Sequence, residues 1–152
     1  MMTEKMDPFA AAPALMQQWK AAADAAEQGL EKSLAELVKI RASQINGCAN
    51  CINMHSIDAH AHGESEQRLY LLAAWREAPV FTPRERAALA WTDALTRLSQ
   101  GHTQSAAKAD LDAHFTPQEQ VALTMLINII NGWNRLVAAF GLWYDMPAAK
   151  AA

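Results

Sequence analysis

The chain contains two cysteines, Cys48 and Cys51, which lie three residues apart in the run CANCINMH at residues 48–55. A cysteine thiolate can attack a peroxide or a disulfide, and a second thiol within reach can resolve the product. His55 follows Cys51 by four residues, so on a helix its imidazole would lie one turn away on the same face. There it could take the thiol proton or stabilise the thiolate as an imidazolium. These three residues therefore predict thiol redox chemistry.

The same residues could instead bind a metal ion. Cys48, Cys51 and His55 would supply three of the four ligands that structural zinc usually has, and His60 or His62 could supply the fourth. Zinc sites usually combine two paired ligand motifs, whereas this chain has a single C-x-x-C. Metal binding stays open as an alternative, but we assign no metal ligand and no bound cofactor.

The cysteine pair is expected at the start of a helix. Asn46 and Gly47 end the preceding helix, and if either one caps the next, Cys48 lies in its first turn. The unpaired amides and the positive end of the helix dipole would then favour thiolate over thiol. Helical residues i and i+3 place their Cβ atoms about 5–6 Å apart, whereas a disulfide needs about 3.5–4.5 Å. Closure needs a modest local adjustment, which fits a reversible disulfide better than a permanent one.

The elements that position these residues are predicted to be helices. Alanine and leucine dominate, β-branched residues are sparse, and no alternating strand pattern persists. Two helices open with capping boxes, Thr82-Pro83-Arg84-Glu85 and Thr116-Pro117-Gln118-Glu119. We predict an all-α chain of six to seven helices, at about residues 12–27, 33–44, 48–62, 65–76, 83–98, 106–114 and 117–140. Residues 1 to about 8 and the tail 149–152 are expected to fray.

Composition limits the possible functions. With 152 residues, 51% of them hydrophobic and 19% charged, the chain is predicted to form one domain over 1–152 with its core in 34–142. A net charge of −3 without a basic stripe argues against nucleic-acid binding. We expect a cytoplasmic protein, where two cysteines are more often reduced and reactive than structural.

The most apolar segment is residues 121–142. Asn128, Asn131, Asn134 and Arg135 interrupt it, so we predict no membrane span. Its apolar breadth exceeds what a small bundle buries, which predicts a homo-oligomer. Asn131, Asn134 and Arg135 need partners if buried, and would either anchor a structural contact or line the site.

A family resemblance rests on the residues before the cysteine pair. Glu36 precedes Cys48 by twelve residues and completes the pattern Glu-x11-Cys-x2-Cys-x3-His. The text ELVKIRASQINGC at residues 36–48 resembles the core of the AhpD-like alkylhydroperoxidases, which belong to the carboxymuconolactone decarboxylase superfamily. Asn131-Gly132-Trp133-Asn134-Arg135 is similar to an Asn-x-x-Asn-Arg found late in peroxidase-related members. The resemblance covers residues 34–94 well and the last helix more loosely.

The resemblance implies an AhpD-like helical bundle and a role for each residue. Cys51 would be the peroxidatic thiol and Cys48 the resolving thiol, while His55 would pass the proton towards Glu36 through a water. The substrate would be a hydroperoxide, the reductant an external dithiol of lipoyl or thioredoxin-like type, and the assembly a trimer or hexamer. Well-known members also carry a histidine before the second cysteine. This chain has Asn50 there, which forms hydrogen bonds but cannot shuttle a proton.

Several alternatives remain open at the level of sequence. Ser33-Leu34-Ala35-Glu36 is itself a capping-box pattern, so Glu36 could close the start of its own helix. The chain could be a carboxymuconolactone decarboxylase-type enzyme, although those members generally lack the C-x-x-C. It could also be a non-enzymatic helical protein with a thiol or zinc switch.

Overall fold

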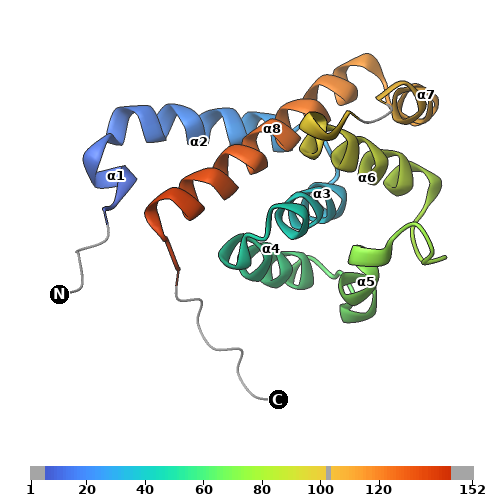
Figure 1. Cartoon of the computed structure of the whole chain (residues 1–152). Coiled ribbons are helices and arrows are strands. Elements are labelled where there is room, and N and C mark those ends of the chain that lie inside the picture. The colour runs from blue at the N-terminus through green and yellow to red at the C-terminus, as the bar shows by residue number, and fades with distance from the viewer. Residues whose placement is uncertain (1–5, 102–103, 145–152) are drawn as a thin grey trace.

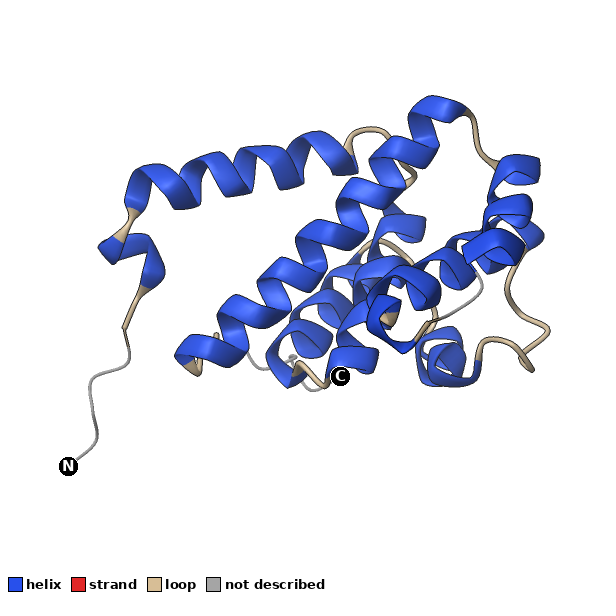
Figure 2. Cartoon of the chain, turned by 45° about the horizontal axis from the view of Figure 1, so that its top comes forward, coloured by secondary structure: helices blue, strands red, loops and turns tan. Residues whose placement is uncertain are grey.

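The computed structural model describes residues 6–101 and 104–144, and within them every regular element is a helix (Figure 2). The predicted all-α class is confirmed. The predicted number of six to seven helices was too low, because the described residues form eight α-helices and two short 3₁₀ helices. Their bounds are α1 Pro8–Ala11, α2 Pro13–Glu27, α3 Lys32–Asn46, α4 Ala49–Ala61, α5 Glu66–Leu71, η1 Leu72–Ala74, α6 Pro83–Thr96, η2 Leu98–Gln100, α7 Gln104–His114 and α8 Pro117–Phe140.

The additional helix is α1, which begins where the sequence predicts a frayed end. Its N-cap is Asp7, whose carboxylate accepts a hydrogen bond of 2.9 Å from the amide of Phe9. Pro8 occupies the first helical position, where its missing N–H costs nothing. Residues 1–5 and the tail 149–152, also expected to fray, lie outside the described residues. The helix predicted over 65–76 divides into α5 and the 3₁₀ turn η1.

Both predicted capping boxes are present. The amide of Glu85 donates to Thr82 Oγ1 at 3.2 Å, and the amide of Thr82 donates to Glu85 Oε2 at 2.8 Å. Thr116 and Glu119 form the same reciprocal pair at 3.3 and 2.8 Å. The second box starts α8, whose observed bounds agree with the prediction. Local capping chemistry therefore defines the start of two long helices.

The helix α3 lies at the centre, packed against α4, α6 and α8 (Figure 1). All ten residues from Leu34 to Ser43 are buried, including the charged Glu36, Lys39 and Arg41. The buried core also includes Ala23 and Ala26 of α2, which packs along α8. A central helix with several buried charges must pair each of them internally, because unpaired buried charges are very costly.

The long apolar helix α8 packs in this core through one face. Its length and hydropathy would allow it to cross a membrane, and among the described residues it is the one such helix. Seven of its residues are buried, among them Asn131 and Asn134. Asn46, at the end of α3, donates to Asn131 Oδ1 at 2.9 Å and to Asn134 Oδ1 at 2.8 Å, and Asn134 Nδ2 donates to Ser43 Oγ at 3.0 Å. The asparagines thus anchor α3 to α8 within one chain.

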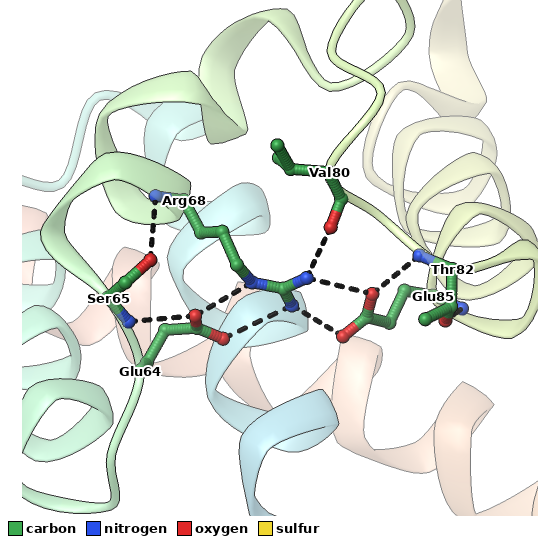
Figure 3. A network of polar contacts seen from close by, with 6 residues as sticks. All are labelled: Glu64, Ser65, Arg68, Val80, Thr82 and Glu85. Carbon is green, nitrogen blue, oxygen red and sulfur yellow. Dashed lines mark hydrogen bonds and ion pairs between the residues drawn. The ribbon is translucent and has the colours of Figure 1, made fainter.

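A polar network ties the end of the α4 region to α6. Arg68 of α5 forms ion pairs with Glu64 at 2.7 Å and with Glu85 at 2.5 Å, and also donates to the carbonyl of Val80 (Figure 3). Glu85 is the same carboxylate that completes the capping box of α6. One arginine therefore fixes the α4–α5 turn against the start of α6.

Candidate thiol site

The two cysteines lie at the turn between α3 and α4. Gly47 ends α3 in the left-handed conformation with φ 69°, which glycine adopts without strain, and Cys48 N donates to Ser43 O across the turn. Cys48 is itself the N-cap of α4, and its Sγ accepts from the amide of Cys51 at 3.4 Å. The expectation that Asn46 or Gly47 would cap this helix is wrong: the turn at Gly47 brings Cys48 into the cap position.

Cys48 and Cys51 form a disulfide with their Cα atoms 5.4 Å apart. This separation lies inside the normal range for disulfides. Both residues are buried, at 7% and 4% exposure. Sulfurs bonded to each other offer no thiolate to a metal, so in this oxidised state the predicted zinc ligand set of Cys48, Cys51 and His55 is not formed.

Glu36 and His55 meet across the α3–α4 interface. His55 Nδ1 lies 3.0 Å from Glu36 Oε2, so the water expected between them is replaced by a direct contact. When His55 is neutral, Nδ1 carries the proton and donates to the carboxylate, and Nε2 then keeps its lone pair. This tautomer can accept a proton on its second nitrogen.

Glu36 does not cap its own helix. α3 begins two residues earlier than the capping alternative requires, with Glu31 and not Ser33 at the N-cap, and the Glu36 carboxylate contacts His55 and Lys39 instead. Burial by itself would raise the pKa of Glu36. The hydrogen bond from His55 and the charge of Lys39 outweigh burial, and they hold the pKa of this carboxyl below its ordinary value. Glu36 is therefore an ionised carboxylate at neutral pH.

A cavity of about 820 Å³ gives access to this group from α2, α3, α4 and α8. Glu36, Asn50, Cys51 and His55 line it, and of the two cysteines only Cys51 does so. Much of the remaining wall is apolar and includes Ala35, Leu126, Ile129, Ile130, Trp133 and Val137. Cys51 thus lines the same cavity as the His55–Glu36 pair, whereas Cys48 does not line it.

Asn50, which stands where the resemblance implies a histidine, forms hydrogen bonds that hold the chain together near the site. It is 3% exposed; its Oδ1 accepts from the amide of Tyr144 at 2.8 Å and its Nδ2 donates to Met54 Sδ at 3.5 Å. The side chain therefore holds the segment that follows α8 against the start of α4.

Two further charged residues belong to the site but lie outside the sequence motif. Asp58 lines the cavity, and one ligand atom each of Glu36, His55 and Asp58 lie within 4.8 Å of one another. Lys39 Nζ lies 2.7 Å from Glu36 Oε1. Both residues stand three positions after a motif residue, on the same helical face, and that spacing could have identified them.

The three groups could hold a cation in principle, but Lys39 works against it. Its ammonium already neutralises Glu36 and would repel a divalent ion at the same carboxylate. Neither His60 nor His62 joins the group formed by Glu36, His55 and Asp58, although His62 lines the same cavity. His60 is exposed, and His62 Nδ1 contacts the carbonyl oxygen of Asp58 at 2.7 Å. The arrangement is better suited to holding and moving a proton than to binding a metal ion.

Comparison with known proteins gives a consistent result. A family model described as the carboxymuconolactone decarboxylase family matches residues 13–94. The uncharacterized protein YdfG of Bacillus subtilis is 39% identical over 115 residues, which cover 76% of this chain and 78% of YdfG. The uncharacterized protein YnjA of Escherichia coli is 31% identical over 78% of this chain, which spans 63% of that relative.

Solved structures show the same fold. A protein of unknown function from Agrobacterium tumefaciens, described as a candidate AhpD antioxidant defence protein, matches with a TM-score of 0.89 and 36% identity over 95% of this chain and 100% of its own. The AhpD core of an uncharacterized peroxidase-related protein from Ralstonia eutropha matches with a TM-score of 0.75 over 88% of this chain and 72% of its own. At 22% identity, that second likeness shows the fold alone.

Proposed function

The chain belongs to the carboxymuconolactone decarboxylase family, among its AhpD-like members, and we propose that it is a thiol-dependent hydroperoxidase. The observation that carries the proposal is the shared cavity. Cys51 lines it together with His55 and Glu36, and Cys51 is also paired with Cys48, which does not line it. A cysteine that lines a cavity together with a proton acceptor, and that is paired with a second cysteine, is what a two-cysteine peroxide reaction needs.

The proposed cycle starts from the reduced pair. Cys51 gives its thiol proton to Nε2 of His55, whose Nδ1–H is held by Glu36. The thiolate attacks the terminal oxygen of the hydroperoxide, the O–O bond breaks, and the alkoxide takes the proton from the imidazolium and leaves as the alcohol. Cys51 is now a sulfenic acid. The Cys48 sulfur attacks it, water leaves, and the disulfide forms.

The cavity wall supports an organic hydroperoxide as the substrate. Leu126, Ile129 and Ile130 of α8, together with Trp133, give an apolar wall to the cavity that Cys51 lines. Transfer of apolar substrate surface to this wall from water contributes about 25 cal/mol per Å². A hydroperoxide with an alkyl or aryl group should therefore react at lower concentration than hydrogen peroxide.

The disulfide must be reduced from outside the chain. An external dithiol, of lipoyl type or in a thioredoxin-like protein, would attack one sulfur of the disulfide. It would give up two electrons and leave as its own disulfide, so that Cys48 and Cys51 return to thiols. Such dithiols are maintained in the cytoplasm, which is where we place the cycle. We further propose a trimer or hexamer, which would cover exposed apolar side chains such as Leu15, Val121 and Met125.

The test is rapid mixing of the reduced protein with one equivalent of cumene hydroperoxide, followed by mass mapping. We expect loss of two thiols, one Cys48–Cys51 disulfide and one equivalent of cumyl alcohol. No disulfide above the level of a Cys48→Ser/Cys51→Ser control would reject the proposal. Decarboxylation of a carboxymuconolactone by that same double variant would instead support the other activity for which the family is named, since lactone decarboxylation needs no thiol.

A further inference from the structure

Lys39 is a buried cation between two carboxylates. Its side chain is 7% exposed, and its Nζ lies 2.7 Å from Glu36 Oε1 and 2.8 Å from Glu27 Oε1. Glu36 belongs to the site, whereas Glu27 is half exposed at the end of α2. The lysine therefore connects the outer helix α2 to the carboxylate that holds His55.

We propose that Lys39 is a positioning residue of the thiol site, whose ammonium keeps Glu36 ionised and thereby fixes the tautomer of His55. The proposal rests on the hydroperoxidase function, in which Nε2 of His55 takes the thiol proton. It assigns Lys39 no contact with the substrate or with sulfur.

Lys39 is the cation in direct contact with Glu36, and it acts there together with the hydrogen bond from His55. The helix of Glu36 itself supplies Lys39, α4 supplies His55 and Asp58, and α2 supplies Glu27. The same cavity is also lined by Lys32 of α3, by Lys20 and Asp24 of α2 and by His62, none of which forms a hydrogen bond or ion pair with Glu36. The facing residues of α8 are apolar, namely Leu126, Ile129 and Ile130. Two further carboxylates, Glu27 and Asp58, thus lie near Glu36, and Lys39 is the one permanent cation in contact with it among the described residues. Without it, burial would favour a neutral Glu36, and the hydrogen bond from His55 alone would oppose this.

The chemical consequence follows from the hydrogen bond between Glu36 and His55. An ionised Glu36 can only accept, so Nδ1 of His55 must carry the proton and Nε2 stays free. A protonated Glu36 would donate to Nδ1, and the proton of the neutral imidazole would then lie on Nε2. That tautomer cannot take a proton from Cys51. The pKa shifts of the two partners are those of an ion pair. The pKa of Glu36 is lowered, and the pKa of Lys39 is raised by Glu36 and Glu27 although burial would lower it.

The experiment follows the Glu36 carboxyl directly. In reduced protein labelled with ¹³C at glutamate side chains, the Glu36 signal is assigned by its loss in Glu36→Gln and titrated in the wild type and in Lys39→Gln, which keeps a hydrogen-bond donor without the charge. Lys39→Arg restores the charge, and Glu27→Gln removes the outer partner of Lys39. Lys39→Met is the second uncharged variant, and circular dichroism verifies the fold of each.

We expect the Glu36 midpoint to move to higher pH in Lys39→Gln and Lys39→Met, to return towards the wild type in Lys39→Arg, and not to rise in Glu27→Gln, which removes a negative charge. In Lys39→Gln and Lys39→Met, the rate of Cys51 oxidation by hydroperoxide at pH 6 should be about tenfold lower than in the wild type, and it should recover as the pH rises. An unchanged Glu36 titration in a folded uncharged variant overturns the proposal. Because this titration needs no turnover, an inactive wild type would reject the hydroperoxidase function without affecting the test of Lys39.

Discussion

His55 Nδ1 of α4 lies 3.0 Å from Glu36 Oε2 of α3, although the two residues are 19 positions apart in the chain. The contact depends on the reversal at Gly47, where the left-handed turn aligns α4 against α3. It fixes both the orientation and the tautomer of the imidazole beside Cys51. The chemistry that we propose depends on this pair, so its disruption should have a larger effect on rate than on stability.

Glu36→Gln should slow oxidation of Cys51 by hydroperoxide about 100-fold, because it impairs His55, the general base that Glu36 holds. The amide can still occupy the site, but it does not stabilise an imidazolium. Stopped-flow measurement with cumene hydroperoxide provides the rate. Glu31→Gln, at the exposed N-cap of the same helix, is the matched control and should retain the wild-type rate. A Glu36→Gln rate within a factor of about three of wild type would remove Glu36 from the mechanism.

Asn50→Ala tests whether Asn50 has taken over any role in proton transfer. Its amide holds the backbone of Tyr144, so we expect a loss of about 1 kcal/mol in the free energy of unfolding. Because the side chain carries no transferable proton, the rate of Cys51 oxidation should change less than about tenfold. Urea denaturation and stopped flow measure the two effects. A rate loss as large as that of Glu36→Gln would place Asn50 in the relay.

Sequence alone could predict the parts that depend on neighbouring residues. The capping boxes at Thr82 and Thr116, and the full extent of α8, follow from signals within a few positions. The spacing of Glu36, the two cysteines and His55 predicted a group that the structure brings together, with Glu36 against His55 and Cys51 bonded to Cys48, while the roles of these residues stay a prediction. The start of α4 near Cys48 was predicted, but its cap was not identified because a cysteine at an N-cap is unusual, and α1 was missed because a single Asp-Pro pair was its only signal.

The remaining features depend on how helices pack. The direct contact of His55 with Glu36, and the burial of Lys39 between Glu36 and Glu27, are set by the approach of α4 and α2 to α3. No local pattern specifies those approaches. The sequence is also compatible with a capping role for Glu36, and only the start of α3 at Lys32 rules that role out. Asn50 likewise has its structural role through Tyr144, which is 94 positions away.

The contact between Trp19 and Gly132 predicts an unusual response to alanine. A Cβ at Gly132 would lie 2.5 Å from Trp19 Cζ2, although alanine in a helix is normally favoured by about 0.5–1 kcal/mol. We expect Gly132→Ala to lower the free energy of unfolding by about 1–2 kcal/mol, as overpacking does. Urea denaturation followed by circular dichroism measures it. In a Trp19→Leu background the same change should become neutral or favourable; an equal loss in both backgrounds would contradict the packing argument.

Asp93 predicts how stability depends on pH. Burial would raise the pKa of Asp93, but hydrogen bonds from Arg41 and Arg76 outweigh it and lower the pKa below its ordinary value. The unfolded chain therefore binds the proton more readily than the folded one. The contribution of Asp93 to the free energy of unfolding is complete above its pKa in the unfolded chain, about 3.9, and is lost as the pH falls through its lower pKa in the folded chain. Urea denaturation between pH 7 and pH 3 should show this fall, and Asp93→Asn should make it shallower.

Asp93→Asn should also cost about 3–5 kcal/mol at pH 7, since it leaves the buried Arg41 without its anionic partner. Asp24→Asn is the matched control. The Lys20–Asp24 pair is exposed, so its removal should cost less than about 1 kcal/mol. Equal losses in the two variants would show that the Asp93 cluster behaves like an ordinary surface pair.

The central claim, that Cys51 and not Cys48 meets the peroxide, is tested by the two single cysteine variants in reduced form. With cumene hydroperoxide and a sulfenic-acid probe, Cys48→Ser should react at close to the wild-type rate and carry the probe on Cys51, because the resolving thiol is absent. Cys51→Ser should show no fast phase and no probe on Cys48. The opposite pattern, with a reactive Cys48 in Cys51→Ser and an inert Cys51 in Cys48→Ser, would contradict the account.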